Sequence, residues 1–180
     1  MKVIAVVGMT GSGKSEVARM FNENGFAMVR FGDVTDEELK KQGLPLTEEN
    51  ERPVREAFRK KHGMAAYAIL NLPRIDAALK TSSTVVDGLY SWEEYTHLKE
   101  YYGDSLVIVA VYSSPKMRYT RLGSRKIRPL TLEEAESRDH AEIENMNKGG
   151  PIVMADYTVI NEYSFDDLKQ QVEEIIRRLK

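Results

Sequence analysis

The chain contains no cysteine, which excludes disulfide bonds, thiolate zinc sites and a cysteine nucleophile. Such a sequence is compatible with a reducing compartment. Its three histidines, His62, His97 and His140, are isolated from one another, so no cluster supports zinc ligation. No apolar run approaches the roughly 20 residues that a membrane-spanning helix needs. From these absences we expect a cytoplasmic protein without a membrane partner.

The chain also lacks an excess of basic residues. It has 28 acidic and 26 basic side chains among 180 residues, and an isoelectric point of about 6.0. Nucleic-acid-binding domains are generally basic, so this balance argues against a nucleic-acid partner. No repeat, linker or low-complexity tract divides the sequence. We predict one domain over residues 1–180, as a monomer or a homodimer.

A glycine-rich segment near the N-terminus bears most directly on function. It fits the pattern G-x-x-x-x-G-K-[ST] at every fixed position, and its residues are Gly8, Met9, Thr10, Gly11, Ser12, Gly13, Lys14 and Ser15. Glycines let the backbone wrap so that N–H groups point at phosphate oxygens, and the start of a following helix adds a favourable dipole. In this pattern Lys14 contacts the outer phosphates and Ser15 binds Mg²⁺.

The flanking residues support this interpretation. Residues 3–7 form an unalternated apolar run, which is typical of a buried parallel strand, and residues 16–24 have apolar side chains at helical spacing. A glycine-rich turn that binds nothing would not require a lysine and a serine at those two positions. Strand, loop and helix together predict a phosphate-binding loop for ATP and Mg²⁺.

Four further stretches, at 26–31, 84–86, 106–112 and 157–160, are rich in strand-forming residues. The most apolar of them, 106–112, is expected to be a central strand, and a final helix is expected from Ser164 to near Lys180. The segments between the strands have helical patterns. We therefore predict an α/β fold, a three-layer sandwich around a five-stranded parallel sheet.

Residues 34–80 are too many for a simple crossover between two strands. Their pattern predicts helices over about 36–42, 48–61 and 64–80, and we expect an acceptor-binding helical insertion over the ligand crevice. The insertion carries Arg52, Arg55 and Arg59 at three- and four-residue spacing. These arginines either form a solvated face paired with nearby glutamates or contact an acidic acceptor.

Two acidic residues follow strands at the edge where open α/β sheets bind ligands. Asp33 comes after the second strand, and it either serves function or caps the next helix. Asp87 and Gly88 end the third strand, beside the expected phosphate loop. Asp87 either holds Mg²⁺ or forms an Asp-Gly turn. Asp87 and Gly88 are both candidates to contact the acceptor.

A segment rich in arginine begins at Pro115. Four arginines lie within eleven residues, and no acidic residue occurs between positions 113 and 132; the four are Arg118, Arg121, Arg125 and Arg128. We therefore expect them to need anions from outside the protein. A capping box over 131–134 begins another helix, which is expected to break at 148–151. We predict that residues 115–147 form a lid that closes over phosphates and excludes water.

Taken in order, the motifs resemble those of the P-loop kinases of nucleoside monophosphates and dephospho-CoA, most closely a largely archaeal branch related to adenylate and dephospho-CoA kinases. The matching stretches are GMTGSGKS at 8–15, FGDV at 31–34, VVDG at 85–88, RYTRLGSR at 118–125, SRDHAEIE at 137–144 and MADYTVIN at 154–161. The resemblance implies a P-loop NTPase fold. It also implies that Arg121 lies against the adenine of ATP, that Arg125 and Arg138 reach its phosphates for catalysis, and that Asn161 flanks the base.

Two departures from that resemblance concern the acceptor. Kinases of nucleoside monophosphates usually hold the acceptor phosphate with one arginine after the second strand and one after the Asp-Gly, and this chain has neither. Either Arg55 or Arg59 replaces them, or the acceptor differs. Dephospho-CoA kinases transfer to a ribose hydroxyl and use an aspartate near the position of Asp33 as base. The acceptor, phosphate or hydroxyl, therefore stays open.

Two functional hypotheses follow from these patterns. The first is an ATP- and Mg²⁺-dependent phosphotransferase that acts on a small nucleotide-like acceptor. The second is a nucleotide-binding regulator or slow ATPase whose helical insertion binds a protein partner. The two missing arginines keep the second hypothesis open.

Overall fold

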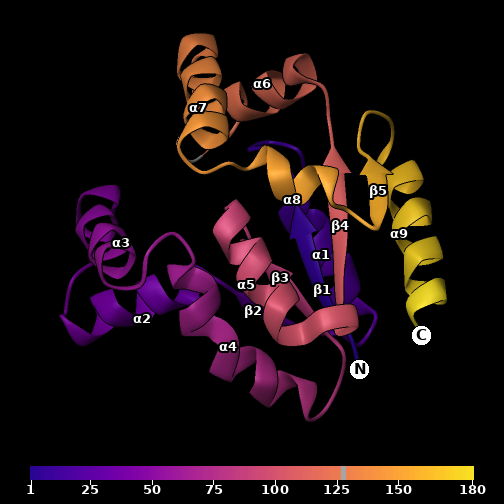
Figure 1. Cartoon of the computed structure of the whole chain (residues 1–180). Helices are drawn as coiled ribbons and strands as arrows, with labels where there is room; N and C mark the ends of the chain where they lie inside the picture. The colour runs from indigo at the N-terminus through magenta and orange to yellow at the C-terminus, as the bar shows by residue number, and fades with distance from the viewer. Residues whose placement is uncertain (127–128) are drawn as a thin grey trace.

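The computed structural model describes residues 1–126 and 129–180. These residues contain a parallel sheet whose strands are β1 (Val3–Val7), β2 (Ala27–Arg30), β3 (Thr84–Asp87), β4 (Leu106–Tyr112) and β5 (Tyr157–Ile160). The strand order is β2-β3-β1-β4-β5, so β1 lies at the centre (Figure 1). The register places Asp87 beside both Val6 and Arg30 at the carboxyl edge. The prediction of a five-stranded parallel sheet in an α/β fold is confirmed.

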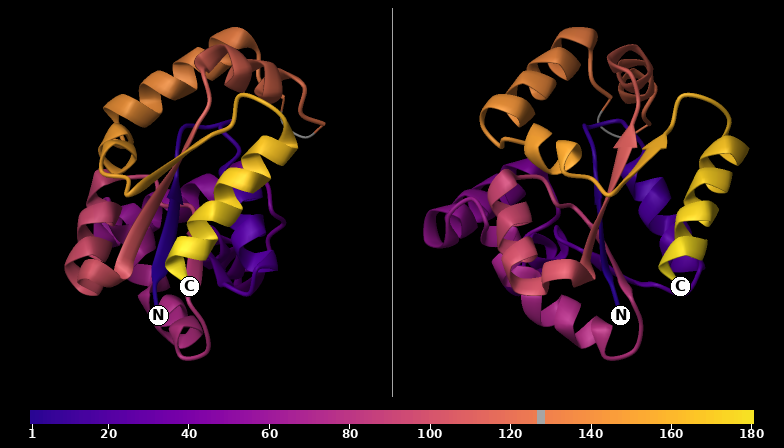
Figure 2. Two further views of the ribbon diagram at one scale, coloured as in Figure 1. Left: turned by 90° about the vertical axis from the view of Figure 1, so that its right-hand side faces the viewer. Right: turned by 45° about the vertical axis from the view of Figure 1, so that its right-hand side comes forward.

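Helices cover both faces of this sheet, as Figure 2 shows from two sides. On one face, α1 (Lys14–Glu23) and α9 (Phe165–Leu179) pack their apolar side chains against β1, β4 and β5. On the other face, α4 (Ala66–Leu79) and α5 (Trp92–Tyr102) form a second apolar cluster, and a short 3₁₀ helix, Gly103–Ser105, leads into β4. Because β1 is covered on both sides, its five residues are almost completely buried, which accounts for their continuous apolar run.

The segment between β2 and β3 contains α2 (Asp33–Lys41), α3 (Glu48–His62) and α4. Helix α2 begins at Asp33, earlier than the predicted start near residue 36. Asp33 and Asp36 both lie in its first turn, where acidic side chains interact favourably with the helix dipole. Asp33 is therefore the first helical residue and does not cap the helix.

A second correction concerns residues 148–151, where a helix break was predicted. A short helix, α8 (Gly149–Val153), begins there. Pro151 stands in its first turn, where a backbone N–H has no intrahelical partner and its loss costs nothing. Gly-Gly-Pro therefore lies within α8, and the break falls before it, because the preceding helix ends at Glu144. No helix in the described ranges is long and apolar enough to span a membrane.

The arginine-rich segment contains α6 (Pro115–Gly123) and α7 (Leu132–Glu144), which pack together at the carboxyl edge of the sheet (Figure 1). The expectation that its arginines need outside anions is wrong for Arg118. This side chain is buried and donates two hydrogen bonds to Asp139, at 2.7 and 2.5 Å, and one to the carbonyl of Thr10 at 3.1 Å. Asp139 lies on α7, beyond the acid-free stretch. Arg128 lies outside the described residues.

We expect Arg118→Met to destabilise the fold by about 3–5 kcal/mol, because it leaves the carboxylate of Asp139 buried without its partner. Urea unfolding measures the change. Arg19→Met is a matched control, since Arg19 pairs with Glu16 at 2.8 Å where both side chains are about half exposed. Its loss should change stability very little. Equal effects of the two substitutions would show that the buried pair does not hold α6 and α7 together.

Candidate functional site: the phosphate loop and its cover

The glycine-rich loop joins β1 to α1 at the carboxyl edge of the sheet. Gly13 has φ 99°, in the left-handed region that favours glycine. The space where a Cβ would stand at this position is filled by the side-chain amide of Asn161, whose Nδ2 donates a hydrogen bond to the carbonyl of Ser12 at 2.8 Å. The second fixed glycine of the motif is therefore required both by its backbone conformation and by this close approach.

The loop lysine and serine begin α1. Lys14 is 9% exposed, and its ammonium donates a hydrogen bond to the carbonyl of Met9 at 3.0 Å. The hydroxyl of Ser15 donates to Oδ2 of Asp87 at 3.1 Å. Two predicted Mg²⁺ ligands from different elements thus lie in contact. A hydroxyl and a carboxylate are hard oxygen donors that suit Mg²⁺, which usually takes few protein ligands and keeps its waters. No group of three or more His, Asp or Glu side chains suited to a metal occurs in the described ranges.

Glu142, on α7, contacts the phosphate loop. Its carboxylate accepts hydrogen bonds from the backbone N–H of Thr10 at 3.3 Å and from the Thr10 hydroxyl. It also accepts from Nζ of Lys148 at 2.6 Å and from Nε of Arg138 at 3.4 Å. A carboxylate on a backbone N–H of this loop occupies a position that an anion can take. Residues 132 positions apart are thereby joined, and α7 is held over the phosphate loop.

The ring of Tyr90 lies near the ammonium groups of two lysines. The Nζ atoms of Lys14 and Lys148 lie 5.9 and 4.7 Å from the centre of its ring. The tyrosine is placed by the turn after β3, where Gly88 has φ 118° and a Cβ would lie 3.0 Å from Cβ of Phe31. The turn is fixed further by Glu94, which accepts a hydrogen bond from the N–H of Tyr90 at 2.7 Å.

Burial and charge shift the acid–base properties of this cluster. Burial, and after it the charge of Lys148, lower the pKa of Lys14 to about 7, against the opposing charges of Glu142 and Asp87. Burial also lowers the pKa of Lys148. For Glu142, burial acts to raise the pKa, but Lys148 and Thr10 hold it at about 2. The carboxylate of Glu142 is thus charged, and burial disfavours the charged form of both lysines.

The opposite side of the loop is formed by Asn161, Arg121 and Ser113. The guanidinium of Arg121 donates to the hydroxyl of Ser113 at 2.8 Å and to the carbonyl and side-chain oxygens of Asn161 at 2.9 and 3.2 Å. The structure therefore brings together the two residues that the resemblance assigns to the nucleotide base. Arg125, at the end of α6, is exposed and makes no hydrogen bond or ion pair with the described residues.

The site candidates in the segment between β2 and β3 are Asp33, Arg52, Arg55 and Arg59. Arg52 pairs with Glu56 and Arg55 with Glu51, both at 2.9 Å, as the solvated-face interpretation predicts, whereas Arg59 stacks on the ring of Tyr67 with 5.8 Å to its centre. Asp33 lies 3.5 Å from Nε of Arg30. It also lines a groove of about 570 Å³ with the segment that joins α2 to α3.

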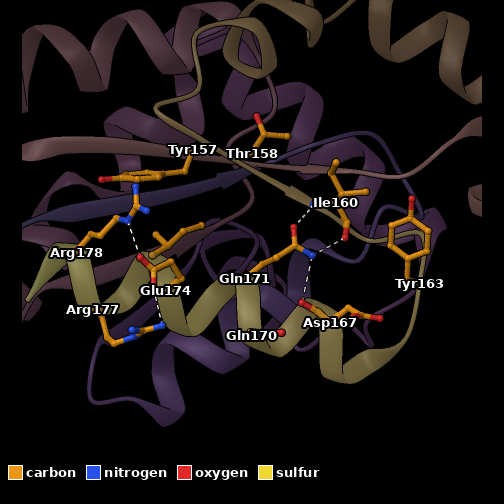
Figure 3. A pocket seen from close by; sticks show the side chains of 11 residues that line it. Tyr157, Thr158, Ile160, Tyr163, Asp167, Gln170, Gln171, Glu174, Arg177 and Arg178 are labelled. Atoms are coloured by element: carbon orange, nitrogen blue, oxygen red, sulfur yellow. Dashed lines mark hydrogen bonds and ion pairs between the residues drawn. The ribbon is translucent and has the colours of Figure 1, made fainter.

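A groove of about 580 Å³ lies at the other edge of the sheet, between β5 and α9 (Figure 3). Gln171 lines this groove, and its side-chain amide accepts from the N–H of Ile160 and donates to its carbonyl, both at 2.9 Å. Arg178 pairs with Glu174 nearby. None of the sequence-predicted site residues lines this groove.

Sequence reasoning missed three members of the loop cluster: Glu142, Lys148 and Tyr90. In the sequence, Glu142 lies within the helix predicted to begin at the capping box over 131–134, and Lys148 lies in the predicted helix break. One signal was available, because Asp139 and Glu142 are three residues apart and so share a face of α7, which predicts that this face meets cations.

The fold and the loop define a P-loop kinase-like domain, and comparison with known proteins agrees. A gluconokinase from Sinorhizobium meliloti 1021 superposes with a TM-score of 0.61 at 17% identity, over 99% of this chain and 93% of that one. A dephospho-CoA kinase from Campylobacter jejuni gives 0.58 at 15% identity, over 99% and 97%. At these identities the likeness establishes the fold alone. Residues 4–139 match the family described as AAA domain.

Sequence similarity places the chain more narrowly. A UPF0200 protein of Thermococcus kodakarensis is 38% identical over 98% of this chain and 100% of its own length. A UPF0200 protein of Pyrococcus furiosus is 38% identical over 97% and 95%. The chain therefore belongs to the UPF0200 family, within the AAA domain family that its residues 4–139 match.

The lowered pKa of Lys14 leads to a prediction about proton uptake. With a pKa of about 7, Lys14 of the ligand-free protein is mostly neutral at pH 8, and bound phosphates favour its charged form. Binding of Mg-ADP at pH 8 should therefore take up roughly one proton. Titration calorimetry in two buffers of different ionisation enthalpy measures this number.

Lys14→Arg is the control for this measurement, because a guanidinium stays charged at pH 8 whether or not nucleotide is bound. The variant should bind Mg-ADP with little proton uptake. If wild type and variant take up the same number of protons, Lys14 is not the group that titrates.

Proposed function

We propose that this protein is an ATP-dependent phosphotransferase that acts on a small nucleotide-like acceptor, of the nucleoside monophosphate or dephospho-CoA type. The observation that carries the proposal is the contact of Ser15 with Asp87 at 3.1 Å beside the buried ammonium of Lys14. That ammonium hydrogen-bonds only a carbonyl of its own loop within the described part of the chain, so the site contains charge for an anion and oxygens for a cation. Mg-ATP supplies both.

Each part of the donor site has an assigned role in this proposal. Lys14 binds the outer phosphates, and Ser15 and Asp87 hold Mg²⁺, which neutralises phosphate charge when it is bound. Arg121 and Asn161 flank the base. Arg138 and Arg125 come from the lid and act on the phosphates during transfer, when positioning and charge neutralisation supply most of the rate.

Contacts of α6 and α7 with the phosphate loop support the proposal that these helices form a lid. Through Glu142 and the Arg118–Asp139 pair, both lid helices are attached to Thr10 of the loop. A covered site excludes water, which favours transfer to an acceptor over hydrolysis. The similar folds of a gluconokinase and a dephospho-CoA kinase support a small acceptor, as does the resemblance to the adenylate-kinase-related branch.

The acceptor side offers two chemistries. Asp33, in the groove beside α2, is the base for a hydroxyl acceptor, which must lose its proton as the phosphoryl group arrives. A phosphate acceptor needs cations, for which Arg55 and Arg59 of the insertion and the Asp87-Gly88 turn are the candidates. We favour the hydroxyl, because Arg55 is already paired with Glu51 and Arg59 is stacked on Tyr67.

ADP release with and without a panel of acceptors tests the proposal. The panel contains nucleoside monophosphates, dephospho-CoA and small sugars. Acceptor-stimulated release supports a phosphotransferase. Slow release that no acceptor changes would favour the alternative, a nucleotide-binding regulator or slow ATPase with a protein partner.

Asp33→Asn separates the two acceptor chemistries. With a hydroxyl acceptor we expect kcat to fall roughly 10²–10⁴-fold, the range for a lost general base, while ATP affinity stays nearly constant. Asp36→Asn is the matched control, because Asp36 also lies near Arg30, at 3.6 Å, in the same turn of α2. A hydroxyl acceptor combined with equal, small losses in both variants would remove Asp33 as the base.

A further inference from the structure

Lys148 is the most deeply buried lysine of the loop cluster. It lies between α7 and α8 and is 2% exposed. Its ammonium donates one hydrogen bond, to Glu142 at 2.6 Å, and stands 4.7 Å from the centre of the Tyr90 ring. An ammonium carries three N–H donors. Within residues 1–126 and 129–180, two of these three have no acceptor.

Lys14 has the same deficit. Its ammonium donates one hydrogen bond, to the carbonyl of Met9, and faces the same Tyr90 ring. Donors without partners on two buried lysines thus lie near one ring, that of Tyr90, which is itself 37% exposed. The charge of Lys148 is also the largest charge effect on the pKa of Lys14, consistent with two ammonium groups close together.

The charges around Lys14 do not balance when its ammonium is protonated. Lys14, Lys148 and Arg138 then contribute three positive charges, whereas Glu142 and Asp87 contribute two negative ones. Burying a cation without full compensation costs several kcal/mol. A site with this surplus favours an additional anion.

The position of the ring indicates which part of a nucleotide that anion belongs to. Arg121 and Asn161 lie on the side of β4 and β5, whereas Asp87 and Tyr90 follow β3 on the other side of β1. If the base lies beside Asn161, a nucleotide laid along the sheet edge has its terminal phosphate towards β3. Lys148 is on the β3 side, because its ammonium lies 4.7 Å from the centre of the Tyr90 ring.

We propose that Lys148 is a second phosphate-binding lysine, which together with Lys14 binds the terminal phosphate of the bound triphosphate. This inference rests on the proposed function. Glu142 positions the ammonium, and Tyr90 provides the surface on which both lysines lie. The competing interpretation is structural: Lys148 would serve only to neutralise Glu142 and hold α7 on the loop.

A neutral replacement of the whole pair distinguishes the two interpretations. Lys148→Met alone would leave Glu142 buried and charged, so the test uses Lys148→Met combined with Glu142→Gln, a pair of similar volume without charge. Glu142→Gln alone is the matched control, because it keeps Lys148. Urea unfolding of both variants checks that they are folded.

Titration calorimetry then compares Mg-ADP with the β,γ-methylene analogue of ATP. We expect the double variant to bind ADP within about twofold of the control and the analogue about tenfold or more weakly, the effect of one lost hydrogen bond from a charged group. Trp92 gives a second readout, because it is the single tryptophan and its backbone N–H donates to the carbonyl of Met146 at 3.4 Å, just before Lys148. In the control its emission should respond to the analogue more than to ADP, and in the double variant that difference should disappear.

Equal changes for ADP and the analogue, or no change for either, would show that Lys148 is structural and would overturn the inference while leaving the proposed function in place. Wild-type protein that binds neither nucleotide would overturn the proposed function itself.

Discussion

Two buried ammonium groups, those of Lys14 and Lys148, lie near the ring of Tyr90. Among the described residues, Glu142 is the one carboxylate that hydrogen-bonds to either of them. The remainder of the site depends on this surplus of positive charge. Burial, together with the charge of Lys148, lowers the pKa of Lys14, Lys148 keeps Glu142 ionised, and the covered loop becomes a place where an anion is stabilised. The same carboxylate, through Thr10, holds α7 on the phosphate loop.

The fold could be predicted from the sequence wherever local signals and burial agree. Val3–Val7 and Leu106–Tyr112 are continuous apolar runs because sheet strands covered on both faces leave few places for polar residues. Ser91 and Thr131 start helices at capping boxes that the structure contains. Helix α8 could not be predicted in this way, since Gly-Gly-Pro is locally a breaker and becomes helical only where its proline falls in a first turn.

The same distinction applies to the candidate site: residues with a local sequence signal were predictable, and residues placed by helix packing were not. Lys14, Ser15 and Asp87 were predictable, because a loop motif and two neighbouring strand ends determine their positions together. Glu142 and Lys148 were not, because contact with the loop depends on how α7 packs across more than a hundred residues of sequence. The pairing of Arg118 with Asp139 was missed for the same reason. Asp139 lies on α7, so its contact with Arg118 depends on how α6 and α7 pack together and not on nearness in the sequence.

The central claim is that this charged loop serves transfer of a phosphoryl group to a small acceptor. The most direct test uses ATP labelled with ¹⁸O in its terminal phosphoryl group, incubated with Mg²⁺, the protein and the acceptor panel, and follows the label by mass spectrometry. Transfer predicts that the labelled phosphoryl group appears on one acceptor, and that Lys14→Ala, which removes the loop cation, abolishes this product. Label found only in inorganic phosphate, at the same rate with every acceptor, would contradict the claim.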